Sequence, residues 1–219
     1  MIRMLDWRSI DTVLLDMDGT VLDLHFDNYF WRSHVPQRYA EVHGMPLAVA
    51  HNELSVRYQR HLGTLNWYCV NFWTRELQLD IAQLKTEVQH LIAVHPHVPE
   101  FLQAIRSAGK RVTLVTNAHP KSLALKMQHT RLDTHFDALI TAHQIGLPKE
   151  HPDFWDKLQG VACYDPAHTL LVDDSLPVLR SAQAYGIAHL RAVRVPDSQD
   201  GRKDVEGFQA IESFDDIMP

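Results

Sequence analysis

Residues 12–20 read Thr-Val-Leu-Leu-Asp-Met-Asp-Gly-Thr, and this stretch decides the fold. The apolar run from Thr12 to Asp16 is typical of a short strand that is buried on both faces of a parallel sheet. Asp18 follows Asp16 by two residues, which places both carboxylates on the same side of an extended chain. Gly19 then permits a tight turn beside a bound ligand. We therefore expect a strand that delivers two acids to one site.

Further apolar runs predict the rest of the sheet, at residues 111–116, 138–141, 169–173 and 187–193. Helical patterning follows at residues 98–108, 121–129 and 176–185, with Gly109 and Gly186 as stop signals for the first and the last. Alternation of strand and helix predicts an α/β fold, namely a Rossmann-like parallel sheet with helices on both faces. The polar stretch 196–207 is expected to be a surface loop before a short terminal helix.

The segment from residue 24 to residue 95 interrupts this alternation. Its pattern is predominantly helical, with breaks expected near Pro36, at residues 44–46 and near Gly63. It also holds more than half of the aromatic residues, which suits a small helical unit with its own core. We therefore expect two domains, a Rossmann-like core made of residues 1–23 and 96–219 and an inserted helical cap made of residues 24–95.

The composition excludes several function classes. The 219 residues carry a net charge of −6 without a basic run, which argues against binding of nucleic-acid polymers. Apolar runs such as residues 91–94 are far too short to span a bilayer, so no membrane association is expected. Residues 1–11 lack the apolar stretch and cleavage site of a secretory signal. We expect a cytoplasmic protein that is a monomer or a small homo-oligomer.

Cysteine and histidine usage indicates no metal centre of the zinc type. Cys69 and Cys163 lie far apart and form no metal-type pair, so we expect buried free thiols rather than a disulfide. The 15 histidines are scattered along the chain, and their spacing indicates no metal site.

Polar residues stand at the exit of each predicted strand. They are Asp16 and Asp18, then Thr116 and Asn117, then Lys149 after a loop, and finally Asp173 and Asp174. In open α/β sheets, ligands bind beyond the carboxyl ends of the strands, where the strand order reverses. Two carboxylates about 4 Å apart repel each other by about 4 kcal/mol at an effective dielectric constant of about 20. An all-oxygen cluster of this kind suits Mg²⁺.

The same residues suit transfer of a phosphoryl group. A carboxylate such as Asp16 can attack phosphorus to form an acyl phosphate. Asp18 can protonate the leaving alkoxide and later deprotonate water. Thr116 and Asn117 offer donors to the phosphoryl oxygens, and Lys149 adds a positive charge. These residue types predict a Mg²⁺-dependent phosphomonoesterase that works through a phospho-aspartate.

The chain resembles the haloacid dehalogenase-like hydrolases over nearly its whole length. The matching motifs are Asp16-Met17-Asp18-Gly19-Thr20, Thr116-Asn117, Lys149 and Asp173-Asp174. The resemblance implies that Asp16 is the nucleophile and that Asp18 is the general acid and base. It also implies that Thr116 binds the phosphate and that Lys149 steadies both the nucleophile and the phosphate.

The resemblance further implies a Mg²⁺ ion held by the Asp16 carboxylate, the Asp18 backbone carbonyl and an acid of the Asp173-Asp174 pair. Many members carry Gly-Asp followed four residues later by another Asp. Here Asp173 replaces that glycine, and Val178 stands where the further acid would fall. We favour Asp174 as the direct ligand because it aligns with the aspartate of Gly-Asp, and Asp173 as an alternate or indirect one.

A closer resemblance is to the bacterial GMP/IMP nucleotidases, which remove the 5′-phosphate from purine ribonucleotides. It is carried by residues 16–31, 64–69, 116–120 and 148–150, which read DMDGTVLDLHFDNYFW, TLNWYC, TNAHP and PKE. A purine would then stack on a cap aromatic such as Trp31, Trp67 or Tyr68, although a small bundle also needs such side chains for its core. The expected substrate is thus a purine ribonucleoside monophosphate.

Other functions are weighed against this one. A phosphatase or phosphomutase for sugar phosphates would use the same residues. Dehalogenation is disfavoured, because a halide needs no proton and Asp18 is suited to protonating an alkoxide. A receiver-like regulatory domain carries its acidic pair after the first strand and its target aspartate later, which is the reverse of the order here. Intact Asp16 and Asp18 argue against a catalytically silent phosphate-binding protein.

Overall fold

The computed structural model describes residues 5–219. Residues 1–4, assigned from the sequence to the core domain and to an N-terminus without a secretory signal, lie outside the described residues. Within residues 5–219, six strands form one parallel sheet in the order β3-β2-β1-β4-β5-β6. The strands are β1 (Thr12–Leu15), β2 (Arg111–Thr116), β3 (Ala138–Thr141), β4 (Thr169–Asp173), β5 (His189–Val193) and β6 (Ala210–Ile211).

The predicted α/β fold is confirmed. Strands β2, β3 and β4 begin and end at the predicted residues, and β5 begins at His189 rather than at Ile187. Strand β6 was not predicted, because two residues are too few to show a period of two. It lies in a segment where only a loop and a terminal helix were expected, and that helix is a 3₁₀ helix, Phe214–Ile217.

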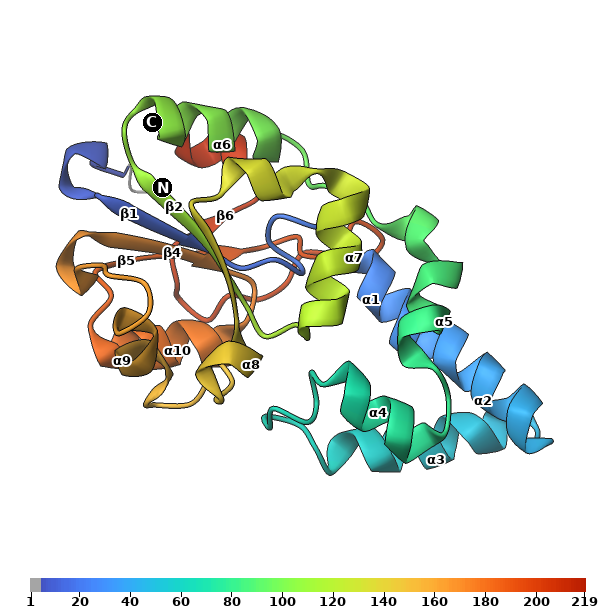
Figure 1. Ribbon diagram of the computed structural model, residues 1–219. Helices are drawn as coiled ribbons and strands as arrows, with labels where there is room; N and C mark the ends of the chain where they lie inside the picture. Colours follow the sequence, from blue (N-terminus) through green and yellow to red (C-terminus); the bar gives the residue numbers. More distant parts are fainter. Residues whose placement is uncertain (1–4) are drawn as a thin grey trace.

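Helices pack on both faces of the sheet (Figure 1). They are α6 (Val98–Ser107), α7 (Pro120–Thr130), α8 (Ala142–Ile145), α9 (Phe154–Gln159) and α10 (Leu176–Tyr185). The predicted helices correspond to α6, α7 and α10, and Gly186 ends α10 with a φ of 108° that a side chain would strain. Helices α8 and α9 were not predicted, since each is too short to show a helical period.

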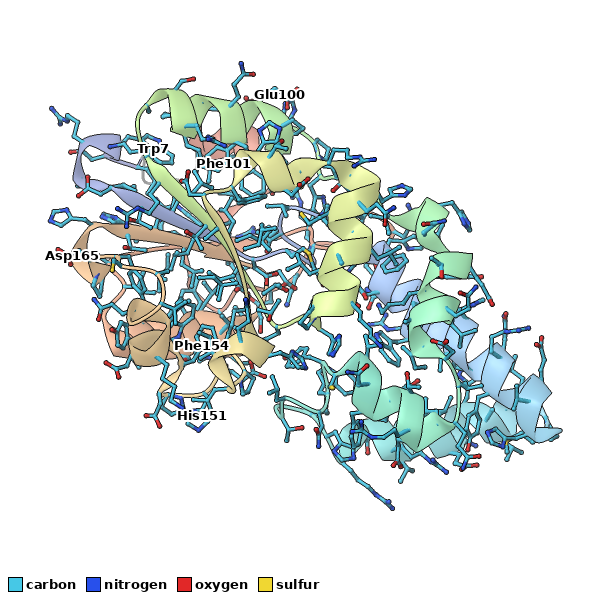
Figure 2. The ribbon with its side chains drawn as sticks, in the orientation of Figure 1. Trp7, Glu100, Phe101, His151, Phe154 and Asp165 are labelled. Carbon is cyan, nitrogen blue, oxygen red and sulfur yellow. The ribbon has the colours of Figure 1, made fainter. Side chains whose placement is uncertain are left out.

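Strand β1 contributes apolar side chains to the cores on both faces of the sheet. Val13 and Leu15 belong to a buried cluster that includes Phe101 of α6. Leu14 belongs to a separate cluster on the other face, together with Phe154 of α9. Figure 2 shows Phe101 and Phe154 on opposite sides of the sheet. Because successive side chains of a strand point to opposite faces, every residue of this strand must be apolar or paired.

The helical segment, residues 24–95, holds five α-helices, a π-helical turn and a 3₁₀ turn, Gln89–Leu91. The α-helices are α1 (His25–Tyr29), α2 (Val35–His43), α3 (Leu47–Gln59), α4 (Val70–Leu77) and α5 (Ile81–Glu87). Figure 1 shows them in blue to green beside the sheet, and α5 contacts α7. The predicted breaks at residues 44–46 and near Gly63 occur, since α2 ends at Gly44 and α3 ends before Gly63.

The predicted break near Pro36 is wrong, because the helix continues through it. A π-helical turn, Phe30–His34, joins α1 to α2 without interruption. Proline has no backbone N–H, so Pro36 cannot donate to the carbonyl of Arg32. The N–H of Val35 instead reaches back five residues to the carbonyl of Phe30. The wider turn thus accommodates the proline, and such turns are frequent at functional sites.

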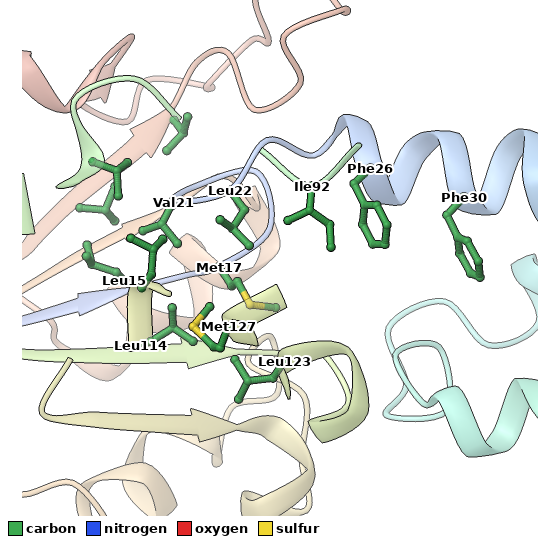
Figure 3. Packing of buried hydrophobic residues seen from close by; sticks show 14 of the residues in the cluster. Leu15, Met17, Val21, Leu22, Phe26, Phe30, Ile92, Leu114, Leu123 and Met127 are labelled. Atoms are coloured by element: carbon green, nitrogen blue, oxygen red, sulfur yellow. The ribbon is translucent and has the colours of Figure 1, made fainter. Parts of the chain in front are cut away.

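The hydrophobic interior runs from the sheet into the helical segment. One buried cluster includes Leu15 of β1, Met17, Leu22 and the α1 side chain Phe26, and it continues to Phe30 (Figure 3). The first strand and the first inserted helix therefore share a core. The domain boundaries given above, after residue 23 and before residue 96, stay a prediction.

The cysteine prediction is correct in one part and wrong in the other. Cys69 and Cys163 are free, but Cys69 is half-buried and Cys163 is exposed. The Cys69 thiol caps α4, where its sulfur accepts a hydrogen bond from the N–H of Phe72 at 3.4 Å, so it lies at a helix end rather than in the core. Among residues 5–219, no helix is long and apolar enough to cross a membrane.

We predict that Trp73→Ala lowers the free energy of unfolding by about 3–5 kcal/mol, because it empties a buried aromatic site. Trp73 is 1% exposed, and its ring lies 5.1 Å from the ring of Tyr58, measured between centroids. Its Nε1 also donates to the carbonyl of Trp67 at 2.8 Å. Urea denaturation measures the change. Val161→Ala, at a residue that is 65% exposed, is the control, and equal changes in the two variants would contradict the packing described.

Candidate active site

A cavity of about 470 Å³ lies beyond the carboxyl ends of β1, β2 and β4. Strand order reverses between β1 and β4, which is where α/β sheets bind ligands. The cavity is lined by all the site residues that the sequence predicted, namely Asp16, Asp18, Thr116, Asn117, Lys149, Asp173 and Asp174. The structure thus brings residues from four distant parts of the chain to one place.

Lys149 holds two of these acids together. Its Nζ donates to Oδ1 of Asp16 and, at 2.6 Å, to Oδ2 of Asp173. The side chain is 2% exposed. Burial acts to lower the pKa of Lys149, but the carboxylates of Asp16 and Asp173 outweigh burial and raise it above its usual value. The ammonium group therefore stays charged and fixes the position of Asp16.

The acids carry more negative charge than Lys149 can balance. Burial raises the pKa of Asp16 to about 6, with Asp173 adding to the rise and Lys149 opposing it. Burial and then the charge of Asp16 raise the pKa of Asp174 to about 6 as well. Burial and the neighbouring acids thus destabilise the ionised form of each carboxylate, and a nearby cation would relieve this.

Gly19 allows this crowding. It follows Asp18 with a φ of 82°, a conformation that side chains rarely adopt. A Cβ atom placed on it would lie 2.9 Å from Cγ of Asp174 and 3.1 Å from Cβ of Pro196. The sequence indicated that a glycine here lets the backbone approach a ligand, and the structure shows that it lets Asp174 approach the β1 turn.

The residues present fit a divalent metal ion. One carboxylate oxygen from each of Asp16, Asp173 and Asp174 lies within 4.8 Å of the other two. Carboxylate oxygens are the ligands that hard divalent cations prefer. Asp173 already accepts hydrogen bonds at both oxygens, from Lys149 and from the N–H of Ser175 at 2.9 Å, whereas the Asp174 carboxylate lies 3.6 Å from Lys203. The geometry therefore favours Asp174 over Asp173 as a direct ligand.

Thr116 and Asn117 contribute in a way that the sequence did not indicate. The Thr116 hydroxyl accepts from the N–H of Ala118 at 3.0 Å. Oδ1 of Asn117 accepts from the backbone N–H of Lys149 at 2.8 Å, and Nδ2 donates to Glu150 at 2.9 Å. The Asn117 side chain thus positions the loop that carries Lys149, and its predicted role in substrate binding stays a prediction.

A chain of charges beside Asp18 was missed by sequence reasoning. Nζ of Lys126, on α7, donates to Oδ1 of Asp18 and to Oδ2 of Asp27, both at 2.5 Å. Oδ1 of Asp27 accepts from Nζ of Lys85, on α5, at 2.7 Å. Burial raises the pKa of Asp18 to about 6 against the opposing charge of Lys126. A lysine in an amphipathic helix is ordinarily exposed, so nothing in the sequence set Lys126 or Lys85 apart.

Aromatic side chains of the helical segment also line the cavity. Trp31, Tyr58, Trp67 and Trp73 line it and pack against one another edge to face or tilted, with ring centroids 5.1–6.3 Å apart. These rings are both core and cavity wall, so the two uses considered from the sequence are compatible. The Tyr68 hydroxyl donates to Glu150 at 3.0 Å and ties the helical segment to the Lys149 loop.

A second cluster, which the scattered histidines did not indicate, joins Cys69, His119 and His143 near the same cavity. Nδ1 of His119 accepts the N–H of Lys121 at 3.1 Å and caps α7, so the neutral ring carries its proton on Nε2. A metal at Nε2 would need that proton removed, and one at Nδ1 would break the cap. The cluster is therefore better described as a contact between α4 and the core.

Comparison with known proteins agrees with this geometry. A family model described as haloacid dehalogenase-like hydrolase matches residues 10–186. The chain is 38% identical over 213 residues to the GMP/IMP nucleotidase YrfG of Escherichia coli (strain K12), covering 97% of this chain and 96% of that protein.

Solved structures show the same fold. A HAD phosphatase from Thermococcus onnurineus superposes with a TM-score of 0.76 at 21% identity, over 94% of each chain. The L-2-haloacid dehalogenase of Xanthobacter autotrophicus superposes with a TM-score of 0.59 at 20% identity, over 84% of this chain and 78% of that one. With the family match and the nucleotidase relative, these likenesses place the chain: it belongs to the haloacid dehalogenase-like hydrolases.

Proposed function

We propose that this hydrolase is a Mg²⁺-dependent phosphomonoesterase that forms a phospho-aspartate on Asp16. One observation carries the proposal. The buried Asp16 carboxylate accepts a hydrogen bond from Lys149, and one of its oxygens lies within 4.8 Å of an oxygen of Asp174. Asp16 and Asp18 line the same cavity. A nucleophile, a proton donor and a cation site are thereby available to one substrate phosphate.

The residues act in a two-step displacement. A carboxylate oxygen of Asp16 forms a bond to phosphorus while the bond from phosphorus to the ester oxygen breaks, and Asp18 gives its proton to that leaving oxygen. Asp18, now ionised, takes a proton from water, whose oxygen attacks the phospho-aspartate and releases phosphate. The Lys149 ammonium offsets negative charge beside Asp16 throughout. Atoms and charges balance over the two steps, and the enzyme returns to its starting state.

Mg²⁺ would be held by the Asp16 carboxylate, the Asp18 backbone carbonyl and Asp174. When bound, it would offset negative charge on the phosphate during the transfer. Gly19 and Asp173 support this arrangement, Gly19 by admitting Asp174 and Asp173 by holding Lys149.

We further propose that the substrate is a purine ribonucleoside 5′-monophosphate, with GMP and IMP preferred. The 38% identity over nearly the whole chain to a GMP/IMP nucleotidase supports this. The cavity also supports it, because Trp31 and Trp67 line the same cavity as the acids and offer aromatic surface on which a flat base can stack. Cytoplasmic location, and assembly as a monomer or small homo-oligomer, stay predictions.

A substrate panel tests this function. With excess Mg²⁺, we expect kcat/KM for GMP and IMP to exceed that for glucose 6-phosphate by at least about 10-fold, because only the nucleotides use the aromatic wall. Glucose 1-phosphate is included, and its products are analysed for isomerisation, which would reveal a phosphomutase. Equal rates for nucleotides and sugar phosphates would end the narrower claim. Absence of phosphate release from every ester would end the whole proposal.

Magnesium is predicted to raise the Tm more at about pH 7.5 than at about pH 5. The pKa of both Asp16 and Asp174 is raised to about 6, so between about pH 4 and 6 the folded state binds more protons than the unfolded state, and stability without metal falls as the pH rises. Above that window the ionised carboxylates bind Mg²⁺, which adds stability by mass action. Thermal unfolding with EDTA or Mg²⁺ measures the effect.

The control for this titration is Asp174→Asn, which removes one carboxylate of the cluster while keeping its shape. Its Tm should respond less to Mg²⁺ at about pH 7.5 than that of the wild type. A Mg²⁺ response of the same size at both pH values, or one unaffected by Asp174→Asn, would contradict the assigned cluster.

A further inference from the structure

The ammonium group of Lys126 lies between one acid of the site and one acid of the helical segment. Lys126 is 1% exposed, and its Nζ hydrogen-bonds the carboxylates of both Asp18 and Asp27. Asp18 belongs to the turn after β1, Lys126 to α7 and Asp27 to α1. One buried ammonium group therefore connects three elements of the fold, namely the turn after β1, α7 and α1.

Asp27 is also bonded by a lysine of a fourth element, α5. Lys85 of α5 is 3% exposed and donates to Oδ1 of Asp27, the oxygen that Lys126 does not use. The Lys85 ammonium also lies 4.4 Å from the centre of the Phe30 ring and 4.9 Å from that of Phe26. Aromatic faces attract a desolvated cation, so Lys85 is fixed on both sides. The order of contacts is Asp18, Lys126, Asp27, Lys85.

Stability alone does not account for this chain of contacts. Removing charges from water costs free energy that their attraction only partly returns, and apolar side chains of similar volume commonly replace buried ion pairs without loss. An apolar neighbour is at hand, since the centre of the buried ring of Phe26 lies 4.9 Å from the Lys85 ammonium and 5.1 Å from that of Lys126. Positioning of a functional side chain is therefore the better explanation. Among these four residues, Asp18 is the one to which the proposed function gives a catalytic role.

We propose that Lys126 is a positioning residue for Asp18, held in place by Asp27 and Lys85, so that the proton donor is aligned only while α1 and α5 are docked against α7. This inference rests on the proposed function, in which Asp18 protonates the leaving group. Lys126 is not among the residues that line the cavity, and its ammonium group bonds Asp18 and Asp27 rather than Asp16. It bonds one oxygen of Asp18, Oδ1, and so fixes the plane in which the other oxygen is presented to the substrate.

The test compares two leaving groups in the same enzyme preparation. The nucleoside oxygen of GMP needs a proton to leave, whereas nitrophenolate leaves without one. For Lys126→Met we expect kcat/KM for GMP to fall about 100-fold and that for p-nitrophenyl phosphate to fall less than about 5-fold, as general acid catalysis is lost. The ratio of the two values does not depend on the fraction of protein that is folded.

Two further variants guard against a folding effect. Lys126→Met leaves Asp18 without its ammonium partner and leaves Asp27 bonded to Lys85 alone, so the two carboxylates repel each other. Combining Lys126→Met with Asp27→Asn removes that repulsion and should show the same change of ratio. Lys157→Met is the matched control, because Lys157 is an exposed lysine on a helix of the opposite face of the sheet. Its ratio should equal that of the wild type.

The decisive comparison uses Asp18→Asn as the background. If Lys126 acts through Asp18, adding Lys126→Met to Asp18→Asn leaves the ratio of the two substrates unchanged. Equal losses for both substrates in Lys126→Met, or a further change of ratio in the double variant, would overturn the inference while the phosphatase proposal stands. Equal losses in Asp18→Asn itself would instead overturn the acid role of Asp18, and the inference with it.

Discussion

The buried ammonium of Lys149 bonds the carboxylates of Asp16 and Asp173, which adjacent strands bring side by side. Because β1 and β4 pair in parallel register, their carboxyl ends deliver acids to one point, and Asp174 follows at once. Two ionised carboxylates about 4 Å apart repel each other by about 4 kcal/mol at an effective dielectric constant of about 20. One ammonium offsets part of this repulsion. The remaining negative charge favours a divalent cation at this point, and in our proposal that cation would also offset the charge of the phosphate.

The helical segment meets this centre through side chains rather than through the sheet. Tyr68 reaches Glu150 beside Lys149, and Asp27 reaches Lys126 beside Asp18. Hydrophobic contact is continuous as well, because Phe26 belongs to the same cluster as Leu15. Movement of the helical segment would therefore change the surroundings of Lys149 and Asp18. In our account, these contacts link closure of the helical segment over the substrate to alignment of the proton donor.

Much of the fold and of the site could be predicted from the sequence, for physical reasons. A strand buried on both faces must be apolar throughout, and acids at strand ends must meet at one edge, so Thr12 to Asp16 and its partners were recognisable. Lys126 and Lys85 were not, because their burial depends on carboxylates far away in the chain. Strand β6 and helices α8 and α9 are too short to show a period, and the π-helical turn Phe30–His34 continues into a helix whose proline indicated a break.

The most direct measurement is chemical identification of the phosphorylated residue. An acid quench of the enzyme during turnover of GMP with Mg²⁺, followed by mass spectrometry of the peptides, detects an acyl phosphate. Our account predicts a phosphate on Asp16, which disappears when hydroxylamine is added and is absent from Asp16→Asn. A covalent phosphate on another residue, or turnover that persists in Asp16→Asn, would contradict the assignment of the nucleophile.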